Sequence, residues 1–309
     1  MVDSSTQQRL ALMQGPPGPV TGPSEDDAPA PQRYDRRRLT YSNTFDNPWK
    51  AYAIRALEWL TGKIRIILML RKFQQRVKTD RRDFWGIALE IMKVDLLTPP
   101  DQLARLPAKG PVIVVSNHPH GLVDGMVIAH LISRVRVDYK VLTRSILTGI
   151  DETAASFLIS VPFPHEEDAQ RKGIEMREAA MKQLANGGVV ALFPSGVVAS
   201  SETMFGPAIE HEWNVFTAKM IRRSGATVVP IYFPGANSRL YQIANRISAT
   251  LRQGLLLHEI VAACKKPQAP VVGQPVDPDE INARIKDPRL FMAWLREQTL
   301  ALKSEAKRR

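Results

Sequence analysis

The stretch from Gly110 to Gly125, which reads GPVIVVSNHPHGLVDG, decides the fold. It opens with a β-branched run after Gly-Pro, a pattern typical of a buried strand in a parallel sheet. Polar residues follow at once, and they include a histidine and a carboxylate on one tight turn. Open α/β sheets carry their active sites at such strand ends. The stretch therefore predicts a strand of an α/β sheet that ends in a functional turn.

His118 and Asp124 are the candidates for chemistry in this turn. A histidine accepts a proton from a hydroxyl or an amine near neutral pH when an acceptor such as Asp124 holds its other ring nitrogen. Pro119 and Gly121 are expected to bend the chain so that the two side chains face each other. The alternative is a turn in which Asn117 and Asp124 only cap backbone amides. The preceding strand and a second motif downstream favour the functional interpretation.

Two further stretches repeat the order of turn, apolar strand and polar corner: GGVVALFPSG at residues 187–196 and ATVVPIYFPG at residues 226–235. The stretch from Arg171 to Ala185 precedes the first of them and predicts an amphipathic helix. Its apolar positions include Ile174, Ala180, Met181 and Leu184. Strands separated by helical segments predict an α/β fold with a mixed or mostly parallel sheet flanked by helices, with the polar corners at one edge.

Together these stretches resemble the glycerolipid acyltransferase superfamily of the bacterial lysophospholipid, PlsC-like type. More narrowly, the chain is similar to the hemolysin-like or ornithine-lipid O-acyltransferase branch, which reads Asn-His-Pro-x-Gly-x-x-Asp-Gly at the first motif. The resemblance covers roughly residues 85–277. Five residues separate His118 from Asp124, as in the narrower branch, whereas the wider superfamily usually has four.

One block departs from the superfamily in a way that bears on the substrate. The superfamily commonly reads Phe-Pro-Glu-Gly-Thr-Arg where this chain has FPSGVV at residues 193–198. In relatives the Arg is expected to hold the acceptor phosphate by charge-assisted hydrogen bonds, which Val198 cannot make. The departure predicts an acceptor other than glycerol phosphate or lysophosphatidate, such as a lyso-aminolipid of the lyso-ornithine type or another lysolipid.

The resemblance implies acyl transfer from a thioester on acyl carrier protein or coenzyme A to a lysolipid, without a further cofactor. In that mechanism His118 removes the acceptor proton and Asp124 stabilises the resulting imidazolium. Amides near Ser195 and Gly196 are expected to hold the oxyanion. The resemblance also implies a set of substrate-binding residues: Asn117, Pro119, Gly121, Phe193, Pro194, Ser195, Gly196, Pro230, Asn237 and Ser238.

Other polar residues have simpler interpretations. His120 makes a weak His-x-His pattern with His118, but the other histidines lack ligand spacing, and we expect no metal. Ser195 lacks the Gly-x-Ser-x-Gly elbow of a nucleophile, so a turn serine is expected. The polar stretch from His165 to Asp168 is either part of the acceptor site or a solvated loop. The single cysteine, Cys264, excludes an intrachain disulfide and suits a reducing compartment.

The charge is concentrated in one segment. The chain has 309 residues and a formal net charge of +11, and residues 33–83 contain 14 Lys and Arg against 5 Asp and Glu. Within this segment, apolar residues recur at helical spacing: Ala53, Leu57, Leu60, Ile64 and Ile67 or Leu68. The longest apolar run, Ile66–Leu70, is far shorter than the ~20 residues of a spanning helix. Trp49, Tyr52 and Trp59 are of the amphipathic kind that anchors at lipid headgroups. A helix in the membrane interface is predicted, and a core helix with a basic face is the alternative.

These patterns divide the chain into three parts. Residues 1–32 are predicted to be a disordered tail without a signal-peptide pattern, residues 33–84 a basic membrane-association region, and residues 85–309 the acyltransferase domain. A closing helix is predicted from Pro288 to Leu302, with Leu290, Trp294 and Leu295 packing inward. With the resemblance, this predicts a peripheral protein on the cytoplasmic side of the bacterial inner membrane.

Two rival functions remain on the same fold: a non-catalytic, basic membrane-binding protein and a nucleic-acid-binding protein. The sequence pI of about 9.9 favours a nucleic-acid-binding protein, because basic patches bind phosphate backbones without sequence preference. No recognised nucleic-acid motif occurs, so no nucleic-acid partner is expected. The presence of both His118 and Asp124 favours the enzyme.

Overall fold

The computed structural model describes residues 40, 42, 47–77, 84–144, 152–162 and 168–306, all within one compact unit, Asp35–Arg309. The predicted tail, His165, Glu166 and Glu167 lie outside the described residues, whereas Asp168 precedes α9 and accepts a hydrogen bond from Arg171.

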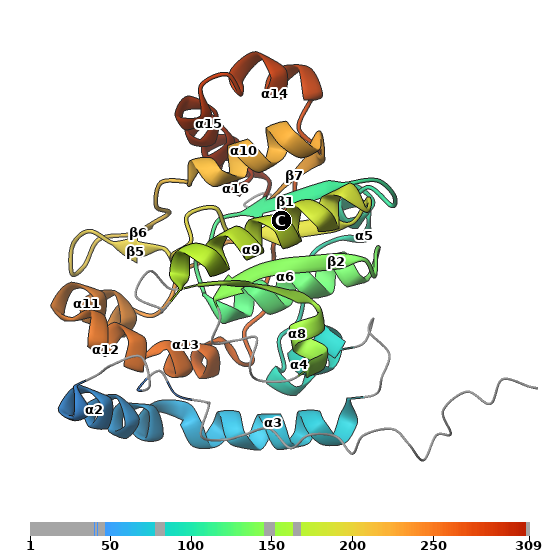
Figure 1. The fold of residues 1–309 in the computed structure, drawn as a ribbon. Coiled ribbons are helices and arrows are strands. Elements are labelled where there is room, and N and C mark those ends of the chain that lie inside the picture. Colours follow the sequence, from blue (N-terminus) through green and yellow to red (C-terminus); the bar gives the residue numbers. More distant parts are fainter. Residues whose placement is uncertain are drawn as a thin grey trace, which may run out of the picture. The chain divides into compact units, whose positions relative to one another are not determined.

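A six-stranded sheet lies at the centre, in the order β3-β2-β4-β1-β7-β8 (Figure 1). Its strands are β1 (Val112–Ser116), β2 (Tyr139–Arg144), β3 (Leu158–Val161), β4 (Val189–Leu192), β7 (Thr227–Tyr232) and β8 (Val271–Val272). All neighbouring strands are parallel except β7 and β8, which are antiparallel. The predicted α/β class with a mostly parallel sheet is confirmed, and so are the three strands that the sequence predicted.

The register of the three central strands brings their polar corners together. β1 lies between β4 and β7, and Val115 of β1 is opposite both Leu192 and Pro230. Because the strands are parallel, their carboxyl ends lie at one edge of the sheet. His118, Phe193 and Phe233 follow the three strands at that edge.

Helices cover both faces of the sheet. On one face, α4 (Phe84–Met92), α6 (Leu122–Ser133) and α13 (Leu256–Ala263) pack against a cluster that includes Val112 and Val114. On the other, α9 (Ala169–Ala185), α10 (Val215–Ser224) and α15 (Pro288–Ala301) pack against Ile113 and Val115. Successive side chains of a strand point to opposite faces, so β1 must be apolar at every position of its core.

Both predicted domain helices are present, as α9 and α15. Leu290 of α15 is 69% exposed, so its predicted inward position is wrong, and the apolar residue Ile174 of α9 is 52% exposed. In α15 the buried face is Phe291, Met292, Leu295 and Thr299. Leu290 lies one residue before that face, and a helix turns by about 100° per residue.

The remaining described elements are short. They are α5 (Pro100–Leu103), α8 (Glu152–Ser156), α11 (Arg239–Ile247), α12 (Ala249–Gly254), α14 (Pro278–Arg284), α16 (Lys303–Ala306) and a two-stranded antiparallel hairpin, β5 (Ser200–Ser201) with β6 (Ala208–Ile209). This hairpin follows β4 and contacts α11. It extends beyond the sheet on the side where β4 ends.

The basic segment forms α2 (Pro48–Glu58), a π-helical turn η3 (Trp59–Lys63) and α3 (Ile64–Arg76). These helices pack through Ile54, Ile66 and the buried Glu58, whose carboxylate accepts a hydrogen bond from Thr40. Part of the predicted apolar stripe is exposed, with Leu60 85% and Ile64 53% exposed, whereas Leu57 of the same stripe packs against the cluster around Tyr241. Across the described residues, no helix is both long and apolar enough to span a bilayer.

Candidate active site

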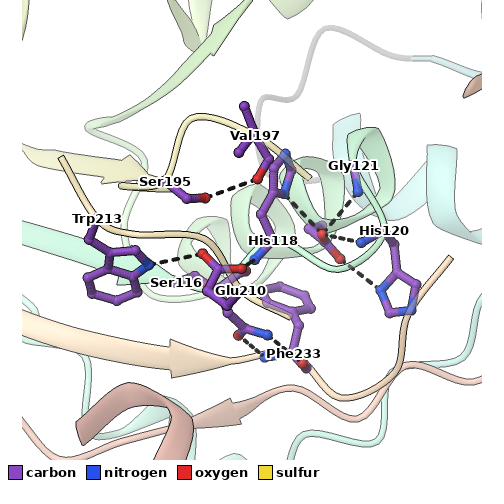
Figure 2. Close-up of polar contacts among 11 residues, drawn as sticks. Ser116, His118, His120, Gly121, Ser195, Val197, Glu210, Trp213 and Phe233 are labelled. Carbon is purple, nitrogen blue, oxygen red and sulfur yellow. Dashed lines mark hydrogen bonds and ion pairs between the residues drawn. The ribbon is translucent and has the colours of Figure 1, made fainter. Parts of the chain in front are cut away.

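The turn between β1 and α6 brings the predicted base and its partner together. His118 Nδ1 lies 3.0 Å from Asp124 Oδ2 (Figure 2). The Asp124 side chain is fully buried, whereas the His118 side chain keeps 16% of its surface exposed. Gly121 has φ +76, a left-handed conformation that costs glycine little and lets the chain reverse into α6. An ionised carboxylate that accepts from Nδ1–H leaves Nε2 of His118 as a proton acceptor.

Asp124 accepts four hydrogen bonds. Two come from the rings of His118 and His120, each 3.0 Å from Nδ1 to oxygen, and two from the backbone N–H groups of His120 and Gly121, at 2.7 and 3.1 Å. Burial by itself acts to raise the pKa of Asp124, but the hydrogen bonds and electrostatic interactions with His118 and His120 outweigh it, so the pKa lies below its usual value. The carboxylate is therefore ionised throughout the neutral range.

The backbone of His118 is held by the two residues that flank the β5–β6 hairpin, Ala199 and Glu210. Its N–H donates to Glu210 Oε2 at 3.0 Å, and its carbonyl accepts from the N–H of Ala199 at 2.8 Å. Glu210 is buried, and its Oε1 accepts from Trp213 Nε1 at 2.9 Å. Glu210 therefore fixes the position of the His118 main chain. No local sequence pattern indicates this role of Glu210, because 92 positions along the chain separate it from His118.

The corner after β4 supports the His118 ring. Phe193 stacks on it with ring centroids 3.9 Å apart and an interplanar angle of 19°. The N–H of Gly196 donates to the Phe193 carbonyl at 2.9 Å, and Ser195 Oγ donates to the Val197 carbonyl at 3.0 Å. The Gly196 amide is thus part of a turn. The Pro194 carbonyl accepts from the N–H of Asn214, which joins this corner to the start of α10.

Other predicted binding residues are engaged in the scaffold. The buried side-chain amide of Asn117 makes two hydrogen bonds to the main chain of Phe233, at 2.7 and 2.8 Å, which join the ends of β1 and β7. Pro119 is buried in the turn, and Pro230 is buried inside β7. Ser238 caps α11 and donates to Glu259 at 2.6 Å.

Two further side chains lie near these corners. A Cβ atom on Gly121 would lie 3.5 Å from Val198 Cγ2, so Val198 packs over the His118 turn. Arg144 extends from the end of β2 and donates to the Gly196 carbonyl at 3.1 Å. Asn237, another predicted binding residue, is buried, and its side-chain nitrogen has no hydrogen-bond partner among the described residues.

The rings of His118 and His120 lie close to the same carboxylate, so they are candidates for a metal site. Both rings direct Nδ1 at the same carboxylate. Within the ranges that the structure describes, no cluster of three or more His, Cys, Asp or Glu side chains is arranged to hold a metal ion.

The fold and the site define an α/β protein with a histidine–aspartate pair at the carboxyl edge of its sheet. Residues 101–234 match the model of the family described as Acyltransferase. This segment runs from α5 to the end of β7 and contains His118, Asp124 and Glu210. The match to that family model covers less than half of the chain, and it includes the turn that holds the histidine–aspartate pair.

Comparison with solved structures finds the crystal structure of the 1-acyl-sn-glycerophosphate (LPA) acyltransferase PlsC from Thermotoga maritima. It is similar over 82% of this chain and 95% of that chain, with 13% sequence identity and a TM-score of 0.44. Comparison with curated proteins finds no match.

Glu210→Gln is expected to lower the free energy of unfolding by about 1–3 kcal/mol. Glutamine has one acceptor oxygen, whereas Glu210 accepts from His118 and Trp213 with two, so one buried donor loses its partner. Urea denaturation measures the loss. The exposed neighbour Glu212 is the control, and Glu212→Gln should change the unfolding free energy by less than about 0.5 kcal/mol. Equal effects of the two substitutions would show that Glu210 does not hold the turn.

Proposed function

We propose that this protein transfers a fatty acyl group from an acyl thioester to the hydroxyl of a lysolipid. The observation that supports this proposal is the hydrogen bond between His118 Nδ1 and Asp124, 3.0 Å long, in the segment that matches the Acyltransferase family model. A histidine in this arrangement suits general-base catalysis, because its Nε2 accepts a proton while the carboxylate stabilises the imidazolium.

His118 Nε2 removes the proton from the acceptor hydroxyl as the oxygen attacks the thioester carbonyl carbon. The tetrahedral intermediate collapses, the carbon–sulfur bond breaks, and the thiolate takes the proton back from His118. The products are the acylated lipid and a free thiol, on acyl carrier protein or coenzyme A, with no covalent enzyme intermediate. Phe193 supports the ring of His118 from one side throughout. We assign the oxyanion to a backbone amide of the Ser195 corner other than that of Gly196, whose N–H already donates to the Phe193 carbonyl.

The acceptor is proposed to be a lyso-aminolipid of the lyso-ornithine type. Val198 supports this choice, because an isopropyl group over the His118 turn offers no hydrogen bond to a phosphate. The guanidinium of Arg144 lies at the neighbouring Gly196 corner and suits the carboxylate of an amino-acid head group. The acceptor is expected to lie among Gly121, Ser195, Gly196 and Asn237, with Asn117, Pro119, Pro194, Pro230 and Ser238 shaping the site.

A lipid mass spectrum tests the function. Cells that express the protein, or His118→Gln at equal abundance, are supplied with lyso-ornithine lipid, lysophosphatidate or a lysophospholipid. A diacylated product that appears only with the active protein establishes acyl transfer and identifies the acceptor. Product from lysophosphatidate alone would refute the aminolipid acceptor, and identical spectra under every supply would refute acyl transfer.

We also propose that the protein binds the cytoplasmic face of the bacterial inner membrane peripherally through α2, η3 and α3. Trp49 and Tyr52 are 81% and 70% exposed. Lys50 and Arg55 lie among them, so the exposed surface combines aromatic rings with positive charge. Such a surface suits the headgroup region of an anionic bilayer.

The double variant Trp49→Ser with Tyr52→Ser is expected to bind anionic vesicles at least about tenfold more weakly than the unmodified chain, because two interfacial anchors are removed. Co-sedimentation with vesicles of anionic and neutral lipid at low salt measures this. Leu290→Ser removes an equally exposed apolar residue from α15 and should leave binding unchanged. Equal losses in both proteins would rule out α2 as the docking helix.

A further inference from the structure

Two histidines share one buried carboxylate in this site. Asp124 Oδ2 accepts from His118 Nδ1 and from the backbone N–H groups of His120 and Gly121, and Oδ1 accepts from His120 Nδ1 at 3.0 Å. The two rings approach the carboxylate from different sides (Figure 2). His120 also donates through both its backbone and its ring, so it holds both oxygens of the carboxylate.

The hydrogen bond from the His120 ring matters because Asp124 is fully buried. A carboxylate oxygen removed from water needs a donor, or the charged form is strongly disfavoured. The His118, His120 and Gly121 donors hold Oδ2, and the His120 ring satisfies Oδ1. Without that ring, the carboxylate is free to rotate about its last bond or to take up a proton. Either change alters the hydrogen bond between His118 Nδ1 and Asp124.

The position of His120 separates its role from that of His118. A Cβ atom on Gly235 would lie 2.8 Å from His120 Nε2, so this nitrogen packs against the loop after β7. Gly235 has φ +97, which also favours glycine at this position. His118 instead stacks on Phe193 at the corner after β4. The two rings are therefore supported by different strand ends.

We propose that His120 is a positioning residue, seated on Gly235, that orients the Asp124 carboxylate and thereby the tautomer and direction of the His118 ring. The inference rests on the proposed acyl transfer for its kinetic consequence. Its structural consequence, the geometry of the His118–Asp124 hydrogen bond, is measurable without any turnover.

The experiment compares His120→Leu with His120→Asn. Leucine fills the space but offers no donor, whereas the side-chain nitrogen of asparagine can take the place of Nδ1. His120→Leu is expected to lower kcat about 10- to 100-fold while KM for donor and acceptor changes by less than about twofold, because misplacement affects the chemical step. His120→Asn is expected to retain kcat within about threefold of the unmodified enzyme.

Proton NMR of the histidine rings supplies a readout that does not depend on activity. The Nδ1–H signal of His118, assigned by its loss in His118→Gln, should persist in His120→Asn and disappear or shift in His120→Leu. If no donor and acceptor pair gives product, acyl transfer fails, but this signal still decides whether His120 orients the pair.

Gly235 gives a second test that leaves both histidines in place. Gly235→Ala brings a methyl group against His120 and is expected to lower kcat as His120→Leu does. Gly110→Ala is the matched control, because Gly110 has φ +82 but open space where a Cβ atom would lie. Adding His120→Asn to Gly235→Ala should restore activity, since the shorter side chain relieves the contact.

Three results would overturn the proposal. If His120→Leu retains both the kcat and the His118 ring signal of the unmodified protein, the ring does not orient Asp124. If His120→Asn loses as much activity as His118→Gln, His120 transfers a proton itself. If Gly235→Ala and Gly110→Ala reduce kcat equally, His120 is not seated on Gly235.

Discussion

His118→Gln is expected to lower kcat for acyl transfer by about 10²–10⁴-fold, the usual contribution of general-base catalysis. Glutamine has nearly the size of histidine and still reaches Asp124, but it cannot accept a proton at neutral pH. KM for both substrates should change little, because the base acts in the transition state. Steady-state release of the free thiol from the acyl donor, measured with the acceptor present, gives kcat and KM.

His258→Gln is the matched control, since this half-buried histidine lies on α13 near the Thr61 carbonyl, away from the His118 turn. Its kcat should equal that of the unmodified enzyme. A His118→Gln protein that retained more than about a tenth of the activity would show that the base lies elsewhere.

Asp124→Asn is expected to lower kcat by a similar factor, about 10²–10⁴-fold, and to destabilise the fold by about 1–3 kcal/mol. The amide oxygen can take the three donors that now meet Oδ2, but the NH2 group then faces the ring of His120. The negative charge that stabilises the His118 imidazolium is lost in the variant. The same thiol-release assay and urea denaturation at pH 7 measure the two effects.

The stability effect of Asp124 has a defined pH dependence. Because folding lowers the pKa of Asp124 from its ordinary value of 3.8, the carboxylate stabilises the native state above that value. This stabilisation is lost as the pH falls through the lower, folded pKa, so the unmodified protein and Asp124→Asn should converge in stability on strong acidification. A difference that widened on acidification below pH 3.8 would contradict the direction of the shift.

Asp287→Asn controls for the loss of a carboxylate that caps a helix. Asp287 accepts from two backbone N–H groups at the start of α15, and asparagine serves as well at that position. Its kcat should be unchanged. If Asp287→Asn destabilised the protein as much as Asp124→Asn, the loss at Asp124 would be a capping effect alone.

The central strands were predictable because each is a continuous apolar run between turn residues. β1, β4 and β7 are buried on both faces, so burial fixes their composition at nearly every position. β2 was not predicted, because YKVLTR mixes Lys140 and Arg144 with apolar residues and carries no clear period. Lys140 and Arg144 are tolerated there because both side chains reach backbone carbonyls near the edge of the sheet.

The His118–Asp124 pair was predictable from sequence because only five residues, all on one turn, separate its members. The role of Glu210 could not be predicted, because a contact between elements far apart in the chain leaves no local sequence pattern. The same is true of Asn117, which was expected to bind substrate but uses its amide on the Phe233 main chain, 116 residues later. The sequence pattern indicates only a metal ligand as a candidate role for His120. Its bond to Asp124 depends on the exact bend of the turn, which residue types alone do not define.

The long-range bonds of the His118 turn have a consequence for how the protein is made. The His118 turn is synthesised long before Phe233, the last of its described hydrogen-bonded neighbours. The main chain of His118 cannot form its hydrogen bonds until Ala199 and Glu210 have also been synthesised. At a synthesis rate of about 5–20 residues per second, roughly 6–23 s separate the two ends of the Asn117–Phe233 contact. Throughout that interval the nascent chain lacks the contacts that hold His118 in place, so we expect the proposed acyl transfer only from a chain that extends at least to Phe233.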